Sequence, residues 1–344
     1  MAMKKILVIY TGGTIGMSKT GTNGALIPVE FEQLYKLIPE LNDLPASIDF
    51  HSWEQPIDST EMTPELWVKL ATQIYENYNH YNGFVVLHGS DTMAFTASAL
   101  SFMLRNLNKP IIFTGSQLPI NIIRTDGKEN LLTSIELALL EDPDGTPAIR
   151  ESVIYFEYKL YRGNRTYKHS SESFKAYSSP NYPLLGEAGL EITLNHPYLM
   201  PAPVNPLEFQ PQIDSNILNI SLFPGINFKW IRKVLENSAE LKALILLTYG
   251  SGNAPKDPEL GILLKSFRDR NIPVINISQC KSGSVKMGKY EVSRWLMDLD
   301  VISGYDMTRE AAITKTMNIL PQIKNPNDFR KMFQTSISGE LTVK

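Results

Sequence analysis

Short runs of apolar, β-branched residues alternate along the first half of the chain with segments whose apolar residues recur at helical spacing. The runs are Ile6–Tyr10, Phe84–Leu87, Ile111–Thr114 and Val153–Tyr158. Each has the length of a strand, and strands separated by helical patterns are typical of βαβ units in a parallel sheet. The pattern predicts an α/β fold in which these four segments are strands of one sheet.

A helix is predicted between the first two of these strands. Thr63 is a favourable N-cap residue, and Pro64 suits the first helical position because an N–H there has no helical partner. Leu66, Leu70 and Ile74 then recur along one face. We expect an amphipathic helix whose apolar stripe faces the core.

The pattern breaks over a proline-rich stretch and then resumes. Prolines oppose both helix and central strand, and five lie close together at Pro197, Pro201, Pro203, Pro206 and Pro211. Further strand-like runs follow at Ile217–Leu222, Ala243–Leu247 and Pro273–Ile277. We expect a larger N-terminal doubly wound sheet domain over residues 1–195, a linker over 196–215 and a smaller C-terminal α/β domain over 216–344.

Composition and charge narrow the classes of partner. The 344 residues are 43% hydrophobic and 20% charged, which is ordinary for a folded protein with two domain cores. A net charge of −3 and a pI of about 6.0 give no broad cationic field for nucleic acid or anionic lipid. A small-molecule substrate is the expected partner.

The single cysteine and the N-terminal segment bear on compartment. Cys280 has no second cysteine to pair with, so an intramolecular disulfide is excluded, and burial is the usual fate of such a residue. The apolar run that ends at Tyr10 is shorter than the roughly 7–15 residues of a signal-peptide core. No later stretch reaches the roughly 18 apolar residues of a membrane span. These patterns predict a cytoplasmic protein.

Candidate chemistry begins where the first predicted strand runs into the sequence TGGTIG, residues 11–16. Two adjacent glycines permit a sharp turn and let a ligand approach the backbone N–H groups. Thr11 and Thr14 place hydroxyls beside that opening. The spacing matches neither G-x-G-x-x-G nor a P-loop, which disfavours a nucleotide. A plain glycine turn would look the same, so this motif alone leaves the function open.

A second candidate follows the strand Phe84–Leu87, where His88-Gly89-Ser90-Asp91-Thr92 precedes a helical pattern over Met93–Leu107. A hydroxyl and a carboxylate therefore lie at a predicted helix N-terminus, where the helix dipole favours an ionised Asp91. Either residue could instead cap the helix. Open α/β sheets bind ligands at the carboxyl ends of their strands, so both loops are predicted to face one site.

Five segments, taken together and in order, resemble the bacterial-type L-asparaginase family. They are TGGTIG from Thr11, HGSDTMA from His88, TGSQLP from Thr114, RGNRTYK from Arg162 and GSGNAP from Gly250. The resemblance covers nearly the whole chain and is strongest to cytosolic, type I members. It implies hydrolysis of L-asparagine to L-aspartate and ammonia by a threonine nucleophile, through an acyl-enzyme ester and without metal or cofactor.

The same resemblance implies roles for particular residues. The family's nucleophile is the second threonine of TGGT, here Thr14. The residues that work with it correspond to Ser90, Asp91 and Lys168, the last placed by RGNRTYK. A solvated surface lysine is the structural alternative for Lys168.

Substrate contacts are implied in the same way. Asp91 suits the α-ammonium of an amino acid, and Ser90 adjoins it. The segment Asp58-Ser59-Thr60 resembles the family's substrate loop, whose serine binds the α-carboxylate. A turn or cap before the helix at Thr63 is the alternative for that segment.

Elementary chemistry limits what these groups can do. A threonine hydroxyl is a weak nucleophile that needs a base or relay, and the developing oxyanion needs donors, for which the backbone at Gly13–Thr14 and the Ser90 N–H are candidates. A free lysine, with a pKa of about 10.4, is a poor base at neutral pH, and a neighbouring carboxylate favours its charged form. Lys168 is therefore interpreted either as a relay through Ser90 or as electrostatic support.

Two departures from the family pattern matter. The family usually has threonine at the position of Ser90; serine keeps the hydroxyl but loses the methyl group that restricts its rotamers, so we expect activity with altered efficiency. In the loop Met17–Pro28 many members carry a tyrosine that contributes to catalysis, whereas the corresponding residue here is Leu26. Gly21 and Gly24 would still let that loop move as a lid.

Family members assemble as dimers of dimers in which the second domain of a neighbour borders each site. The resemblance therefore implies a homodimer or homotetramer, with Asn253 of GSGNAP reaching a neighbour's substrate. A turn asparagine is the alternative.

Other functions stay open at this point. A subunit of a tRNA-dependent amidotransferase shares this kind of amidase core, but it would normally have extra sequence and a basic surface for its RNA partner, and this chain has neither. A non-catalytic regulator would bind asparagine without releasing ammonia. Glutamine differs from asparagine by one methylene, which is worth only about 1–3 kcal/mol of discrimination, so glutaminase activity is not excluded.

Overall fold

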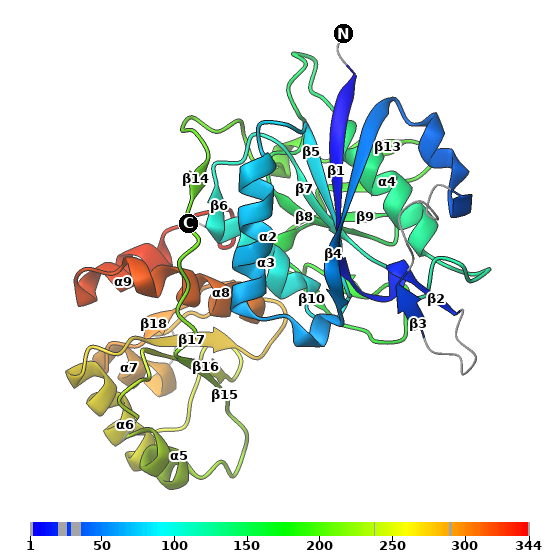
Figure 1. Cartoon of the computed structure of the whole chain (residues 1–344). Coiled ribbons are helices and arrows are strands. Elements are labelled where there is room, and N and C mark those ends of the chain that lie inside the picture. Colours follow the sequence, from blue (N-terminus) through cyan, green and yellow to red (C-terminus); the bar gives the residue numbers. More distant parts are fainter. Residues whose placement is uncertain (1–2, 20–25, 29–35, 237, 289–290, 343–344) are drawn as a thin grey trace. The chain divides into compact units, whose positions relative to one another are not determined.

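The computed structural model divides the chain into two compact units, residues 1–211 and 212–344 (Figure 1). It describes residues 3–19, 26–28, 36–236, 238–288 and 291–342, with the backbone alone for 17–19, 26–28, 291–292 and 326–327. The division falls within the predicted linker over 196–215. Each unit has its own sheet and its own core.

The first unit contains an eight-stranded sheet in the order β13-β12-β9-β8-β7-β5-β1-β4. Strands β4, β1, β5, β7 and β8 are parallel neighbours, and β9, β12 and β13 extend this core antiparallel. The strands are β1 (Lys4–Gly12), β4 (Ala46–Ile57), β5 (Gly83–Leu87), β7 (Ile111–Thr114), β8 (Ser152–Phe156), β9 (Lys159–Arg162), β12 (Gly186–Ala188) and β13 (Ile192–Leu194). Short pairs are formed by β2 (Met17–Lys19) with β3 (Leu26–Pro28), β6 (Leu104–Arg105) with β14 (Glu208–Phe209), and β10 (Tyr167–Lys168) with β11 (Tyr177–Ser178).

The four strands predicted in this unit are confirmed, with changes of up to two residues at their ends. The prediction extended the fourth strand to Tyr158, but β8 ends at Phe156 because Glu157 and Tyr158 have φ angles of +47° and +60° and turn the chain into β9. Strand β4 was not predicted. Among the described strands it pairs with β1 alone, at the edge of the sheet. Polar residues separate its apolar ones, and Trp53 is its one buried residue, so it gives no apolar run.

Three helices accompany this sheet: α2 (Pro64–Asn77), α3 (Met93–Met103) and α4 (Gly127–Leu139). The predicted start of α2 after Thr63 is confirmed, and Leu70 and Ile74 are buried while Leu66 is half-buried. The predicted helix over Met93–Leu107 is too long. It ends at Met103 because residues 104–105 pair with β14, and Asn106 has a φ of +60°.

Both faces of the first sheet are covered by helices. Leu131 and Ile135 of α4 pack with Ile6 and Val8 of β1 in one apolar cluster. The alternate β1 residues are also buried and face the opposite side of the sheet, where α3 contacts β7 and β8 and α2 contacts α3. The layering, with α2 in front of the sheet in Figure 1, is that of a doubly wound domain.

The proline-rich segment before residue 212 is bound to the first unit. The Tyr198 carbonyl accepts hydrogen bonds from Arg162 (2.9 Å) and the Tyr182 hydroxyl (3.0 Å), and the Met200 N–H donates to Glu151 (2.7 Å). Arg162 and Glu151 themselves form a buried ion pair of 2.6 Å. Residues 196–211 of the predicted linker therefore belong to the first unit, and hydrogen bonds hold them against it.

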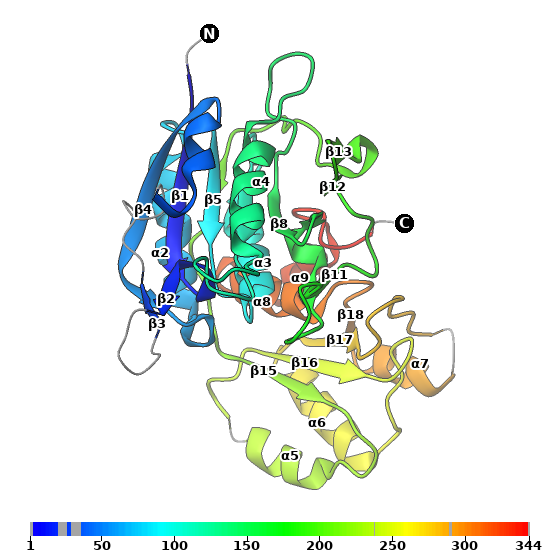
Figure 2. The same cartoon turned by 90° about the vertical axis from the view of Figure 1, so that its right-hand side faces the viewer.

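The second unit is built on the parallel sheet β15-β16-β17-β18. Its strands are β15 (Ile217–Ser221), β16 (Ala243–Thr248), β17 (Val274–Ser278) and β18 (Ile302–Ser303), and its helices are α5 (Phe228–Leu235), α6 (Pro258–Asp269), α7 (Glu291–Asp298), α8 (Arg309–Ile319) and α9 (Pro326–Gln334). The three predicted strands are confirmed to within a residue. Figure 2 shows β15 and β16 with α5 and α6 on one side.

Alternation along β16 accounts for the two cores of this unit. Leu244 and Leu246 pack with residues of α5, α6 and α7, whereas Ala243, Ile245 and Leu247 pack with residues of α8 and α9. A parallel strand buried on both faces reads as a continuous apolar run, which is why the sequence pattern found it.

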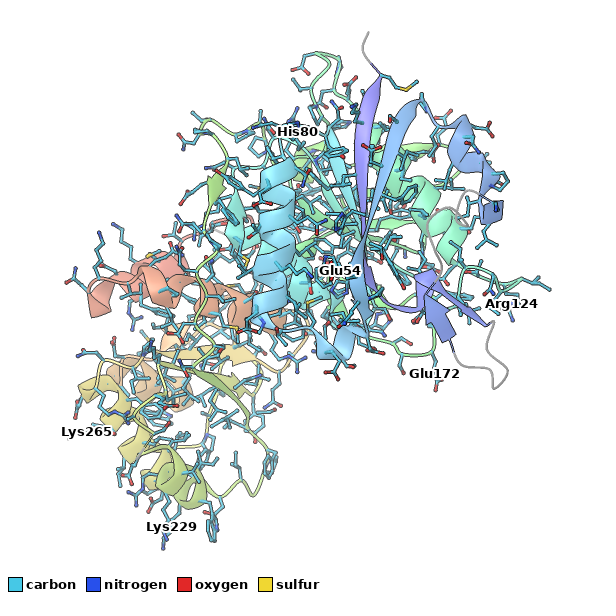
Figure 3. All side chains as sticks on the ribbon, viewed as in Figure 1. Glu54, His80, Arg124, Glu172, Lys229 and Lys265 are labelled. Carbon is cyan, nitrogen blue, oxygen red and sulfur yellow. The ribbon has the colours of Figure 1, made fainter. Side chains whose placement is uncertain are left out.

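The prediction for Cys280 is wrong, because this residue is exposed. It follows the end of β17, where the chain turns at the surface and the Ser278 hydroxyl accepts the Cys280 N–H at 2.9 Å. Both units carry exposed charged and polar side chains, among them Glu54, His80, Arg124, Glu172, Lys229 and Lys265 (Figure 3).

Candidate functional site

Three loops meet at the carboxyl ends of β5, β1 and β4, which are neighbours in the first sheet. A Cβ atom added to Gly13 would lie 2.5 Å from the Cα of Gly89, and one added to Gly89 would lie 2.6 Å from the Cβ and Oγ of Ser59. The Gly13 N–H donates to the Ile57 carbonyl at 3.1 Å. The predicted segments 11–16, 58–60 and 88–92 thus contact one another, and only glycine leaves room for this approach.

Lys168 reaches two predicted site residues at once. Its Nζ donates to Ser90 Oγ at 2.8 Å and to Asp91 Oδ1 at 2.7 Å. The Lys168 side chain is 14% exposed and that of Asp91 57% exposed, so the pair lies at a surface that a solute can reach. The structure brings Ser90, Asp91 and Lys168 together although 77 residues separate Lys168 from Asp91.

The two threonines of the glycine loop differ in what surrounds them. Thr11 is buried, and its hydroxyl donates to the Leu87 carbonyl at 3.1 Å, so it ties β1 to β5. Thr14 begins a 3₁₀ turn over Thr14–Gly16 and is half-buried. Of the two hydroxyls that the sequence placed beside the opening, that of Thr11 is used inside the sheet, whereas Thr14 is partly exposed.

In the segment after β4, Asp58 and Thr60 form a cap, whereas Ser59 contacts a neighbouring loop. Asp58 Oδ1 accepts from the N–H and the hydroxyl of Thr60, both at 2.8 Å, which caps the 3₁₀ turn Ser59–Glu61. These hydrogen bonds lower the pKa of Asp58. Ser59 is buried against Gly89, and its carbonyl accepts from the Thr92 hydroxyl at 2.6 Å. Among residues 58–60, Ser59 contacts the loop that carries Ser90 and Asp91.

Comparison with known proteins shows the family of this chain. A model of the asparaginase N-terminal domain matches residues 5–199, and a model of the glutaminase/asparaginase C-terminal domain matches residues 216–333. The chain belongs to the asparaginase family. It is 42% identical over 352 residues to L-asparaginase 1 of Escherichia coli (strain K12), with 99% of each chain covered.

Solved structures of the asparaginase family resemble the whole chain. The crystal structure of L-asparaginase I from Vibrio cholerae O1 biovar eltor str. N16961 superposes with a TM-score of 0.89 at 41% identity, covering 99% of this chain and all of that one. The thermostable L-asparaginase from Thermococcus kodakarensis gives a TM-score of 0.89 at 32% identity, with the same coverage.

Two residues of this asparaginase fold contact Ser90 without having been singled out from the sequence. Ser90 Oγ lies 3.3 Å from Gln117 Oε1, and Gln117 Nε2 donates to the Ser173 carbonyl at 2.9 Å. The Tyr177 hydroxyl donates to the Ser90 carbonyl at 2.6 Å. Gln117 lies in the TGSQLP segment, which was a usable signal, whereas nothing in the sequence around Tyr177 points to this contact.

His88 is fixed as a neutral ring beneath the site. Its Nδ1 lies 2.7 Å from the Gly89 carbonyl and its Nε2 lies 2.9 Å from Thr96 Oγ1, which itself accepts from Trp67 Nε1 at 3.1 Å. This pattern fits a proton on Nδ1 and a lone pair on Nε2 that accepts the threonine hydroxyl. Burial lowers the pKa of His88 to about 4, against a smaller opposing effect of the Gly89 hydrogen bond.

We expect this histidine to make the fold acid-sensitive. The unfolded chain binds a proton at His88 below about pH 6.5, whereas the folded chain does so only near pH 4. Stability should therefore fall as the pH drops through this window, by up to about 3 kcal/mol. Urea unfolding at pH 7.5 and pH 5, with H88Q beside the wild type, measures it. Equal pH dependence in the two proteins would contradict the assignment.

The remaining predicted residues lie elsewhere. Asn253 belongs to the second unit, where its N–H donates to the Tyr249 carbonyl at 2.8 Å and its Oδ1 is buried without a partner among the described residues. Gly21 and Gly24 of the predicted lid lie outside the described residues. Leu26 is described as part of β3 in its backbone alone.

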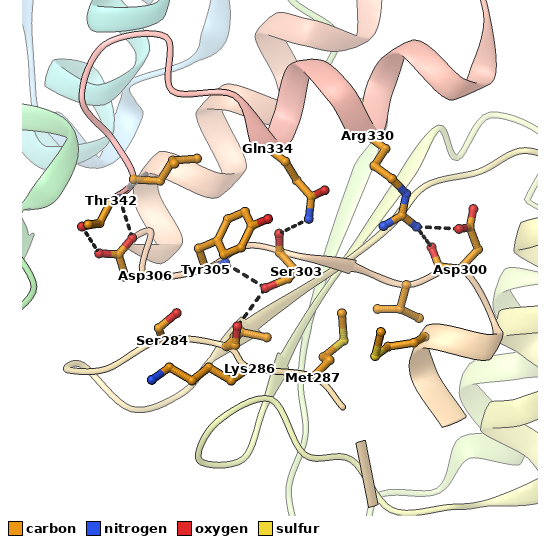
Figure 4. Close-up of a pocket in the computed structure, with 14 residues that line it drawn as sticks. Ser284, Lys286, Met287, Asp300, Ser303, Tyr305, Asp306, Arg330, Gln334 and Thr342 are labelled. Carbon is orange, nitrogen blue, oxygen red and sulfur yellow. Dashed lines mark hydrogen bonds and ion pairs between the residues drawn. The ribbon is translucent and has the colours of Figure 1, made fainter. Parts of the chain in front are cut away.

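A cavity of about 640 Å³ lies within the second unit and is separate from these residues. Figure 4 shows Arg330 paired with Asp300 at 2.5 Å, and Asp306 accepting from Thr342. The Ser303 hydroxyl donates to the Val285 carbonyl at 3.0 Å. None of the predicted site residues lines this cavity, and its polar walls bond largely to one another, so it is not the site that the sequence predicts.

No group of three or more His, Cys, Asp and Glu side chains in the described part of the chain is placed to hold a metal ion. No helix in it is long and apolar enough to span a bilayer.

Proposed function

We propose that this chain is an L-asparagine amidohydrolase that converts L-asparagine to L-aspartate and ammonia. The observation that carries the proposal is the contact of Lys168 with Ser90 and Asp91 beside the Gly12–Thr14 loop. The full-length similarity to L-asparaginase 1 of Escherichia coli supports it.

The reaction follows from the chemistry of an amide. The Thr14 hydroxyl adds to the side-chain amide carbon and loses its proton, and the tetrahedral intermediate expels the protonated amine as ammonia. The resulting ester is cleaved by water, which returns the proton to Thr14 and releases aspartate. Backbone N–H groups near Gly13–Thr14 and at Ser90 are the proposed donors to the oxyanion. No metal or cofactor is required.

Ser90, Asp91 and Lys168 would organise the proton movement. Lys168 donates to both neighbours, so an ammonium held there stabilises negative charge that develops close to Ser90. Asp91 is exposed enough to meet the α-ammonium of a substrate as well. The Ser90 hydroxyl would relay a proton to or from Lys168, whose Nζ it contacts at 2.8 Å, while Gln117 Oε1 helps to orient it.

Three further sets of residues are proposed to contact the substrate or to support that contact. Ser59, which packs on Gly89, is the candidate for the α-carboxylate. Asp58 and Thr60 would hold the turn that presents Ser59. Asn253 would contribute from a neighbouring copy in a homodimer or homotetramer. Its buried Oδ1 has no partner among the described residues, which is compatible with such an outside donor. A cytoplasmic location completes the proposal.

The test is to measure ammonia release from L-asparagine and L-glutamine side by side, together with binding of both by calorimetry. We expect turnover of asparagine, with glutamine slower. Hydroxylamine added to the reaction should intercept the ester and give aspartyl hydroxamate. Tight binding of asparagine with no ammonia release would instead identify a non-catalytic regulator. Equal or faster release from glutamine would reassign the preferred substrate.

A further inference from the structure

Tyr177 and Lys168 form one rung of a short antiparallel ladder. In the pair β10–β11, Lys168 is directly opposite Tyr177. Both side chains reach the same residue: Lys168 Nζ donates to Ser90 Oγ at 2.8 Å, and the Tyr177 hydroxyl donates to the Ser90 carbonyl at 2.6 Å. This rung therefore holds Ser90 by its side chain and by its backbone.

Tyr177 is itself held firmly. Its side chain is buried, and its ring packs edge-to-face on Phe156 of β8, with centroids 5.1 Å apart. The Tyr177 carbonyl lies 3.3 Å from the Tyr161 hydroxyl, which donates to it. Burial, and secondarily the charge of Asp91, raise the pKa of Tyr177 well above its usual value. The hydroxyl consequently keeps its proton and acts as a fixed donor.

A donor at the Ser90 carbonyl fixes more than one atom. Because a peptide group is planar, the direction of the Ser90 carbonyl sets the direction of the Asp91 N–H and the positions of both flanking Cα atoms. The Ser90 and Asp91 side chains, which share Lys168, start from those two Cα atoms. An error in this one peptide plane would therefore displace both groups from the ammonium.

Serine makes this backbone contact more important than threonine would. A threonine side chain is restricted at χ1 by its methyl group, whereas serine is not. Here χ1 is restricted by the hydrogen bonds of the Ser90 hydroxyl with Lys168 and Gln117. These bonds depend on the backbone of Ser90 staying in place, and its carbonyl is held by Tyr177.

We propose that Tyr177 is a positioning residue for asparagine hydrolysis, holding the Ser90–Asp91 peptide where Lys168 serves both side chains. This inference rests on the proposed function. It assigns Tyr177 no proton transfer and no contact with substrate.

The test compares Y177F with Y78F in the full chain. Y177F removes only the hydroxyl that Ser90 uses. Y78F removes another buried tyrosine hydroxyl. That hydroxyl donates to Asn108 Oδ1 at 2.7 Å and does not contact the loops of the site. Loss of one hydrogen bond should lower kcat of Y177F roughly tenfold, with KM changed less than kcat, whereas Y78F should keep the wild-type kcat. Thermal unfolding of both variants controls for structural damage.

The second arm repeats Y177F in an S90T background. If Tyr177 compensates for the missing methyl group, adding Y177F to S90T should lower kcat by no more than about twofold. A smaller loss in S90T than in the wild type would show that residues 90 and 177 are coupled. The alkaline limb of the pH–rate profile should be unchanged in Y177F, because Tyr177 does not titrate in that range.

Each outcome decides a different claim. An active wild type with Y177F equal to Y78F in kcat overturns the positioning role alone. A loss above roughly a thousandfold, or a shifted alkaline limb, overturns it in favour of proton transfer by Tyr177. A wild type that releases no ammonia overturns the proposed function and this inference together.

Discussion

Replacing Thr14 by alanine is expected to lower kcat for asparagine by at least about 10³-fold, because loss of a nucleophile removes the covalent route altogether. The folded structure should persist, since Thr14 is half-buried at the start of a 3₁₀ turn and its hydroxyl forms no hydrogen bond to another described residue of the loops. Ammonia release under saturating asparagine is the measurement, with calorimetry to show that the variant still binds the amino acid.

Two variants sharpen this result. T14S keeps a hydroxyl and should retain a measurable part of the activity. T11V removes the neighbouring hydroxyl, which bonds the Leu87 carbonyl inside the sheet, and should cost about 1–2 kcal/mol of stability with a far smaller loss of kcat than T14A. If T14A and T11V lose activity equally, Thr14 is not the nucleophile.

The second large effect is expected on stability, from a buried ion pair in the C-terminal unit. Lys315 of α8 donates to Glu340. It also donates to the Phe333 and Thr335 carbonyls, both at 2.7 Å. Glu340 in turn accepts from the N–H groups of Ile337 and Ser338. Both charged side chains are fully buried. The pair therefore fastens the chain after α9 to α8.

K315M should lower the free energy of unfolding by about 3–5 kcal/mol, because it leaves the Glu340 carboxylate buried without its cation. Urea unfolding followed by tryptophan fluorescence and by circular dichroism measures the effect, and the two signals together show whether the units unfold separately.

A pair in the same unit whose lysine is exposed provides the control. Lys242 bonds Asp214 at 2.5 Å, but the Lys242 side chain is 56% exposed. K242M should therefore cost less than about 1 kcal/mol. Similar losses of unfolding free energy in K315M and K242M would show that burial does not determine how much the Lys315–Glu340 pair contributes to stability.

Many strands and helices were predictable because their buried residues follow a regular pattern of apolar residues in the sequence. The strands β1, β5, β7, β16 and β17 are buried on both faces, so they appear as apolar runs. The helix after Thr63 was predictable because Pro64 and the apolar stripe act locally. Strand β4 was missed since an edge strand with polar residues owes its place to the neighbouring β1, and the end of α3 was misplaced since residues 104–105 pair with a segment about 100 residues away.

The site divides along the same line. The sequence by itself determined that two glycine-bearing loops follow parallel strands, which must end at one edge of a sheet, and its motif order pointed to the asparaginase family. Only the tertiary structure decided that Thr11 is committed to the Leu87 carbonyl, that Ser59 packs on Gly89, and that Tyr177 and Gln117 contact Ser90. The physical reason is that hydrogen bonds between residues tens of positions apart depend on distances that the folded chain creates, and no local pattern of residues records them.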